Sequence, residues 1–443
     1  MASDPSLPKR RRALLSINLM TVREGKAAAE SHFGQPDPID PADAHILGRR
    51  GVLTDLWPPV SAVIRAVAIP VIVSFVLVLR RPEAVFRSQF AYEEPYVFYA
   101  AAHSGGVLET ILTPWAGMLQ LFPRLVHAGL LLVPGEIAPA ISMLVLYLAI
   151  GLIAGFMASD RMAAAIPSRR VRVAFALSFA IVPATAGPLV SILNAHWFGA
   201  IYLIALSIAT YDPRWRWADR IGAGLMALTG PTSIILAPLF WRRRDLLVIV
   251  GIGAAIQILF VLNAPPRSPP LDPVGTLIVL MERVGQSVLG SRTGTSLAAI
   301  PAIPLTVTLA AAVALAVSGL PWRTTAVFAY GTGAIAASGI VKLGPAAFAD
   351  PTVGIRYFIP IVIFLLLVAI AGIGARRFLV VPLAAALVVG VIGDVRMYRL
   401  PDRNWPEAAA CIETPGPCLV EVYPHRWSFH WPDGLPPTMR PDD

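Results

Sequence analysis

Long apolar segments that alternate with arginine-bearing stretches dominate this sequence and leave it few folds. Of its 443 residues, 56% are hydrophobic and only 14% are charged, whereas soluble domains carry about 25% charged residues. Almost all of the 36 basic side chains are arginines that punctuate the apolar runs. Positive charge beside a span favours the cytoplasmic side for that end of the span. The net charge of +9 is therefore interpreted as a signal for membrane topology. The composition therefore predicts an all-α polytopic membrane protein that contacts membrane lipids and binds no nucleic acid.

The apolar runs predict about nine transmembrane helices plus one re-entrant hairpin. We expect residues 1–56 to form a disordered cytoplasmic tail, residues 57–395 the transmembrane domain, and residues 396–443 a short external tail. The expected spans cover about residues 59–79, 137–158, 173–191, 198–210, 245–263, 300–319, 324–341, 357–374 and 378–394. A Pro-rich external loop is expected at residues 264–298.

The hairpin prediction rests on residues 221–241, which look like one span but have arginines on both sides. Arg220 precedes the segment, and Arg242 begins a run of three arginines after it. Its centre, Thr229-Gly-Pro-Thr-Ser233, interrupts a helix because proline lacks a backbone N–H. Broken backbone at membrane depth is tolerated where it is buried in protein or lines a cavity. A hairpin that enters and leaves on the cytoplasmic side satisfies both arginine groups.

Two adjacent carboxylates, Glu93 and Glu94, follow the first span in an aromatic setting. They begin a long first external loop, residues 82–136, whose Pro-broken apolar stretch 113–124 predicts interfacial helices lying on the membrane. Acidic groups at a membrane face are costly unless they are used, so the pair is a candidate site. The alternative interpretation is a solvated loop start. Arg80 and Arg81 next to the pair predict either an anionic-headgroup site or simple Arg–Glu neutralisation.

Other polar residues are expected on the same external face. Arg356 lies at the outer mouth of a span and suits bidentate phosphate binding; the alternative interpretation is snorkelling to lipid headgroups. Arg124, His103 and His196 complete the candidate set. The sequence contains no P-loop, no GxGxxG and no zinc motif.

The external tail contains the only two cysteines, Cys411 and Cys418. An oxidising external location favours a short-loop disulfide between them.

These features together resemble the polytopic C-class (GT-C fold) glycosyltransferases, which use sugars carried on a polyprenyl phosphate. The matching stretches are the acidic pair with its downstream aromatics through Tyr99, the loop segment Trp115–Arg124, and the broken segment Gly224–Ser233 with Pro238. A fourth stretch, Arg356–Pro360, resembles a late motif of related bacterial membrane proteins without an assigned function. The resemblance covers about residues 55–395. Departures are Glu93 where the family commonly has Asp, and a short tail where many members carry a large external domain.

The resemblance implies sugar transfer from a polyprenyl-phosphate donor to an acceptor on the external face of the bacterial inner membrane. It implies Glu93 as general base, with Glu94 as its partner or as a ligand of Mg²⁺ or Mn²⁺. It further implies phosphate binding by Arg356, Arg124, Arg80 and Arg81, and an acceptor or phosphate role for His196 and His103.

Two other functions remain open from the sequence. A lipid-linked glycan polymerase or ligase would share the donor and the side of the membrane, and a non-catalytic assembly or export component would need no acidic pair. Ion-coupled transport is disfavoured, because the expected spans are nearly free of ionisable residues.

Overall fold

The computed structural model describes residues 60–431 with short gaps, at residue 186 and at residues 265–271, 298–299, 351–353, 396–400, 415 and 423–426. The expected cytoplasmic tail, residues 1–56, lies outside the described residues. The structure divides the chain into Met1–Ala62 and one compact unit that begins at Val63. The helices and strands described here belong to this second unit, apart from the first residues of α3.

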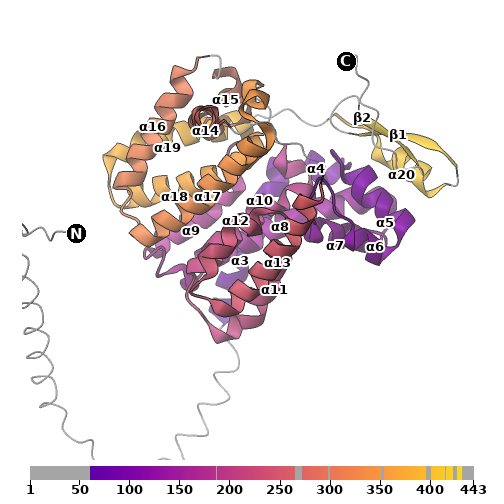
Figure 1. Cartoon of the computed structure of the whole chain (residues 1–443), viewed down its shortest axis with the longest axis horizontal. Coiled ribbons are helices and arrows are strands. Elements are labelled where there is room, and N and C mark those ends of the chain that lie inside the picture. Colours follow the sequence, from indigo (N-terminus) through magenta and orange to yellow (C-terminus); the bar gives the residue numbers. More distant parts are fainter. Residues whose placement is uncertain are drawn as a thin grey trace, which may run out of the picture. The chain divides into compact units, whose positions relative to one another are not determined.

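Helices make up most of the described part of the chain (Figure 1). Labels with η mark single 3₁₀ or π turns. In order, the longer elements are α3 (Val60–Arg80), α4 (Glu83–Phe86), η2 (Glu94–Tyr99), α5 (Ala100–Gly105), α6 (Val107–Leu112), α7 (Leu121–Leu130), α8 (Ala138–Ala158), α9 (Arg169–Ser178), α10 (Ala195–Ile208), α11 (Arg216–Ala227), α12 (Thr232–Leu236), α13 (Arg244–Leu262), α14 (Pro273–Val288), α15 (Ser291–Leu297), α16 (Ala302–Val317), α17 (Trp322–Leu343), α18 (Ile359–Gly374), α19 (Val381–Val395) and α20 (Trp405–Glu413). The strands β1 (Cys418–Val422) and β2 (Trp427–Trp431) form one antiparallel hairpin.

Four segments of the described chain are long and apolar enough to cross a membrane: Gly135–Ala158, Arg244–Leu262, Trp322–Leu343 and Ile355–Gly374. Four shorter apolar helices accompany them, at Val67–Arg80, Ile192–Ile208, Ala302–Val317 and Phe378–Asp394. The prediction of a mostly helical chain with helices able to cross a membrane is thus confirmed, while the count of nine spans is not.

Burial separates inner helices from peripheral ones. In the segment that ends in α18, 78% of the apolar window is buried, against 28% in α13. α17 lies beside α18 (Figure 1), and α18 also contacts α9, α10 and α16. The apolar face that α13 leaves open has the composition of a lipid-facing surface.

Two expected elements differ from the structure. Residues 173–191 do not form one span: α9 ends at Ser178 and a broken segment follows, because Pro183 cannot donate to the helix ladder. The loop expected at residues 264–298 contains α14 and α15 instead, and α14 packs against α16. Arg283 of α14 is buried and donates hydrogen bonds to the carbonyl oxygens of Phe348 and Asp350.

The segment 221–241 returns on itself. Asp219, at the beginning of α11, accepts hydrogen bonds from Arg161 at 2.8 and 2.6 Å and from Arg243 at 3.2 Å. Arg220 lies 3.7 Å from Asp245. The two arginine-flanked ends of the segment are therefore joined, and its broken centre, between α11 and α12, forms the tip.

The first loop and the tail share a second hydrophobic core, apart from that of the helix bundle. Phe90, Phe98 and Tyr99 pack there with Trp405 and Ile412 of α20. Trp405 donates its indole N–H to the carbonyl of Gly135 at 2.9 Å, and Glu413 accepts the N–H of the same glycine at 2.9 Å. The tail, expected only as a short extension, thus covers the first loop.

Candidate functional site

The two members of the acidic pair lie in different environments. Glu93 is partly exposed, and its carboxylate has no hydrogen bond or ion pair to any residue in the described part of the chain. Glu94 is 0% exposed. Tyr92, directly before them, has φ of 57°, a left-handed conformation that a tyrosine rarely adopts, and η2 is a π turn. Strained backbone and π turns concentrate at functional sites, so both features mark this point of the chain.

Hydrogen-bond donors surround the Glu94 carboxylate. Oε1 accepts the backbone N–H of Ile192 at 3.1 Å and the hydroxyl of Ser142 at 3.4 Å, and Oε2 accepts the N–H of Ala91 at 3.3 Å. The partners come from α8, from the 3₁₀ turn before α10, and from the loop that precedes η2. Both oxygens are occupied by protein donors, so Glu94 is placed as a structural acid, and its expected metal-ligand role gains nothing from this geometry.

His127, which the sequence did not single out, completes this site. Its Nε2 lies 4.0 Å from Oε1 of Glu94, and both side chains are 0% exposed. Its Nδ1 lies 2.8 Å from the carbonyl oxygen of Pro123, so Nδ1 carries the proton and Nε2 presents its lone pair. Nε2 has no other hydrogen-bond partner among the described residues. The rings of Phe90 and Phe98 flank the imidazole.

Burial acts on the two groups in opposite directions. Loss of hydration raises the pKa of Glu94 to about 8, even though four hydrogen bonds to the carboxylate oppose the rise. The same loss lowers the pKa of His127 to about 4, and the nearby Arg124 charge lowers it further. At neutral pH the pair therefore consists of a carboxylic acid and a neutral imidazole.

α7 is held in place by two other elements. Leu121 donates its N–H to the carbonyl of Leu228, and Phe122 donates to the hydroxyl of Thr229, both at the hairpin tip. The first N–H groups of a helix lack partners within it, so the broken segment caps α7. Gln257 of α13 binds both backbone groups of Leu119, just before α7. The hairpin thus fixes the helix that carries His127 and Arg124.

Arg124 is almost fully buried on α7, at 1% exposure. Its guanidinium donates to the carbonyl of Val97 at 2.9 Å and lies 4.3 Å from the centre of the Phe98 ring. Burial lowers its pKa to about 10, which leaves it charged at neutral pH. Arg124 belongs to the Glu94 neighbourhood, but it is enclosed by protein.

Arg80 and Arg81 have acidic partners other than the pair. Arg80 lies 3.9 Å from the buried carboxylate of Asp394, which also accepts the first N–H of α15 at 2.8 Å. Arg81 forms an ion pair with Glu83 at 2.8 Å. Of the two expectations for these arginines, the internal contacts favour neutralisation, with partners other than the expected glutamates.

His196 and Arg356 lie near each other. The charges of Arg356 and Lys342 both act on the His196 ring. The centre of this ring lies 4.1 Å from that of Trp197, with the two planes tilted by 48°. Its Nδ1 lies 2.6 Å from the carbonyl of Leu193. Gly230 of the hairpin tip packs beneath His196, where an added methyl group would lie 3.3 Å from its Cβ. Arg356 itself is exposed.

One short turn connects the two groups of candidate residues. Glu94 binds the N–H of Ile192, and the carbonyl of the next residue, Leu193, contacts His196. The acidic pair, His196 and Arg356 therefore belong to one end of the bundle.

The structure places His103 in an exposed position, with its ring centre 4.6 Å from that of Tyr99. Cys411 is disulfide-bonded, and Cys418 is the only other cysteine in the chain.

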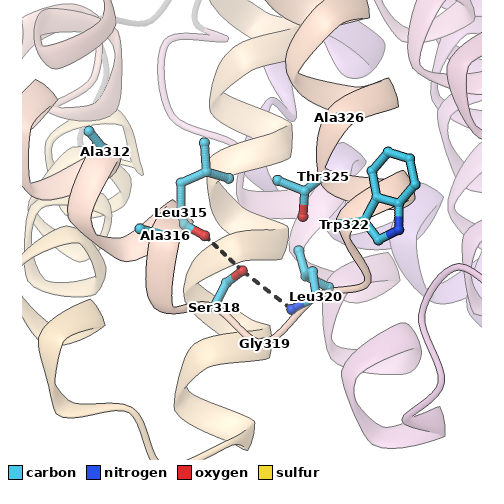
Figure 2. Close-up of a pocket in the computed structure, with 9 residues that line it drawn as sticks. All are labelled: Ala312, Leu315, Ala316, Ser318, Gly319, Leu320, Trp322, Thr325 and Ala326. Carbon is cyan, nitrogen blue, oxygen red and sulfur yellow. Dashed lines mark hydrogen bonds between the residues drawn. The ribbon is translucent and has the colours of Figure 1, made fainter. Parts of the chain in front are cut away.

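A cavity of about 470 Å³ lies at the turn between α16 and α17 (Figure 2). Its lining is apolar except for Ser318, which binds Leu315 and Leu320, and Thr325. Lys342, near His196, is at the other end of α17. At 1.5 Å per residue, the helix places about 30 Å between the two. The cavity is therefore separate from the candidate site.

The described residues contain no group of three or more His, Cys, Asp or Glu side chains that could hold a metal ion. Comparison with known proteins found no matching family model, curated protein or solved structure.

Proposed function

We propose that the chain is a membrane glycosyltransferase that moves a sugar from a polyprenyl-phosphate donor to an acceptor hydroxyl, with Glu93 as general base. The observation that carries this proposal is the contrast within the acidic pair. Glu93 is accessible and has no hydrogen-bond or ion-pair partner among the described residues, whereas Glu94 beside it is enclosed and held as a neutral acid. A general base needs an accessible lone pair within reach of the proton it removes.

In the proposed reaction, the acceptor O–H proton passes to the Glu93 carboxylate while the acceptor oxygen bonds to the anomeric carbon of the sugar. The bond from that carbon to the donor phosphate oxygen breaks, and its electron pair leaves with the lipid phosphate. The exposed guanidinium of Arg356, near Lys342 and His196, is the proposed partner of this phosphate. Arg80, Arg81 and Arg124 already bind protein groups, so we assign them to structure.

Replacement of Glu93 by Gln tests the base. The purified protein in lipid nanodiscs is supplied with a panel of labelled polyprenyl-phosphate sugars and acceptors, and transfer is measured by product formation. Loss of a general base lowers the rate by about 10²–10⁴-fold. Glu109→Gln is the matched control, because Glu109 is exposed on α6 of the same loop, and we expect it to transfer at the wild-type rate.

Wild-type transfer by Glu93→Gln would remove the base assignment. Absence of transfer by the wild type with every donor would favour a non-catalytic assembly or export component. Formation of a lipid-linked polymer in place of a transferred single sugar would favour the polymerase or ligase.

The proposed topology places the helices in the bacterial inner membrane around one re-entrant hairpin, with the N-terminus in the cytoplasm and the C-terminus outside. The joined ends of residues 221–241 support the hairpin. Single cysteines introduced at Arg214 and Arg242 should both react with a membrane-impermeant reagent only from the cytoplasmic side. Labelling of position 242 from outside would rule out the hairpin and reverse the orientation of every later segment.

A further inference from the structure

Glu94 and His127 are fully buried neighbours, with Nε2 of the imidazole 4.0 Å from Oε1 of the carboxyl group. Nδ1 of His127 is committed to Pro123, so the lone pair on Nε2 faces the Glu94 carboxyl at 4.0 Å. A shift of about 1 Å brings the two atoms within hydrogen-bond range. The unsatisfied acceptor is Nε2, and a buried acceptor without a donor is costly. A protonated Glu94 supplies the donor that Nε2 lacks.

We propose that Glu94 and His127 share one buried proton, which keeps Glu94 uncharged and makes it a positioning residue that leaves Glu93 as the only anion of the acidic pair. The catalytic part of this inference rests on the proposed function, whereas the shared proton does not. Two adjacent carboxylates cannot both ionise freely in a low-dielectric site. A proton held on Glu94 removes that repulsion from the neighbouring Glu93 carboxylate.

The charged and titratable surroundings of the pair are few. Arg124 on α7 disfavours a second positive charge on His127. Glu93 directly precedes η2, and α8 and the turn before α10 contribute the neutral groups Ser142 and Ile192 N–H. On the neighbouring helices, Glu109 of α6 and His103 of α5 are exposed. None of these groups replaces His127 as the acceptor.

Infrared spectroscopy of the full-length protein in nanodiscs tests the shared proton without any substrate. A carboxylic-acid C=O band should be present in the wild type at pH 7 and absent in Glu94→Gln, while the control Glu109→Gln retains it. The band should disappear as the pH is raised through about 8. His127→Phe, which suits the surrounding aromatic rings, should shift the band to higher frequency, because the acid loses its hydrogen-bond acceptor. Identical bands in the wild type and Glu94→Gln would show an ionised Glu94 and overturn the proposal.

Transfer assays test the positioning role. Glutamine is uncharged and can donate to His127 Nε2, so Glu94→Gln imitates the protonated acid. We expect it to lose less than about tenfold in rate, against the 10²–10⁴-fold loss expected for Glu93→Gln. An equal loss in the two variants would mean that Glu94 acts in its charged form, which contradicts the proposal. A wild type that transfers no sugar would defeat the proposed function alone, because the infrared band still decides whether the proton is shared.

Discussion

At the scale of single residues, neighbours in sequence have opposite roles. The sequence predicted an important acidic pair, but not which member would be buried, because that depends on a π turn and on the strained backbone at Tyr92. It also did not indicate His127, 33 positions beyond Glu94, since α7 looked only like an apolar interfacial stretch. An isolated histidine on such a helix carries no signal until the fold shows what it faces.

The Glu94 proton makes stability depend on pH in a defined direction. A folded-state pKa of about 8, above the ordinary value of 4.5, stabilises the fold fully below pH 4.5. This contribution is lost as the pH rises through about 8. The apparent melting temperature of the wild type should therefore fall relative to that of Glu94→Gln between pH 5 and pH 8.5. Melting curves in nanodiscs at a series of pH values measure this difference.

The contribution of His127 to stability has the opposite pH dependence, and it does not affect the comparison between the wild type and Glu94→Gln. Its pKa is lowered in the folded state, so its contribution is present above pH 6.5 and is lost toward pH 4. The histidine is common to both proteins, and the difference between them isolates Glu94. Parallel melting profiles from pH 5 to pH 8.5 would count against a protonated Glu94.

At the scale of elements, the arginines predicted that residues 221–241 return on themselves, but they did not predict the helices of residues 264–298. Arginine on both flanks of residues 221–241 predicted that the segment returns, and the Asp219 contacts join its ends. The same reasoning did not reveal α14, because the prolines of residues 264–298 made this stretch look like a Pro-rich external loop. Arg283 donates hydrogen bonds to backbone carbonyl groups, and a hydropathy profile does not show that a buried arginine has such partners. Pro183 could have indicated the break after α9, but the apolar residues around it made residues 173–191 look like one continuous span.

The hairpin ends should be sensitive to the loss of one carboxylate. Asp219→Asn leaves Arg161 and Arg243 without their anionic partner in a site where Asp219 is 2% exposed. Removal of one partner from a buried ion pair costs about 3–5 kcal/mol. We expect lower yield and a markedly lower melting temperature, measured on the purified protein.

Asp212→Asn serves as the control for this hairpin variant. Asp212 pairs with Arg214, whose side chain is 86% exposed, and exposed pairs contribute little. The double variant Asp219→Asn with Arg161→Met should recover part of the loss, because one uncompensated charge is removed with it. Equal melting temperatures for the two single variants would refute a stabilising role of the Asp219 pairs.

At the scale of the whole molecule, the bundle and the first loop have separate hydrophobic cores. Apolar composition was sufficient to predict a helical membrane protein, since helices satisfy their own backbone in lipid. It could not predict the second core, which joins Phe90 and Tyr99 to Trp405 across more than 300 residues. Contacts of that kind leave no periodic pattern in the sequence.

The second core predicts that a change in the tail affects the first loop. Trp405→Ala removes a side chain that is 2% exposed, and such truncations cost about 3–5 kcal/mol. Amide hydrogen exchange in residues 94–103 should become faster, while exchange in α18 should not change. Trp215→Ala, which removes an exposed tryptophan near the joined ends of the hairpin, should alter neither. Unchanged exchange in residues 94–103 after Trp405→Ala would mean that the tail does not support the loop.

The hydrogen bonds between Gln89 and the segment Pro401–Arg403 have a consequence for how the protein is made. Ribosomes deliver the N-terminal part of a chain first, so the loop that carries Glu93 emerges long before the residues that close over it. During the synthesis of every helix in between, Phe90 and its neighbours lack their cover. A nascent or prematurely terminated chain therefore exposes an aromatic surface on this loop. Such a surface distinguishes an incomplete chain from a folded one and is the kind of surface that chaperones and quality-control proteases bind.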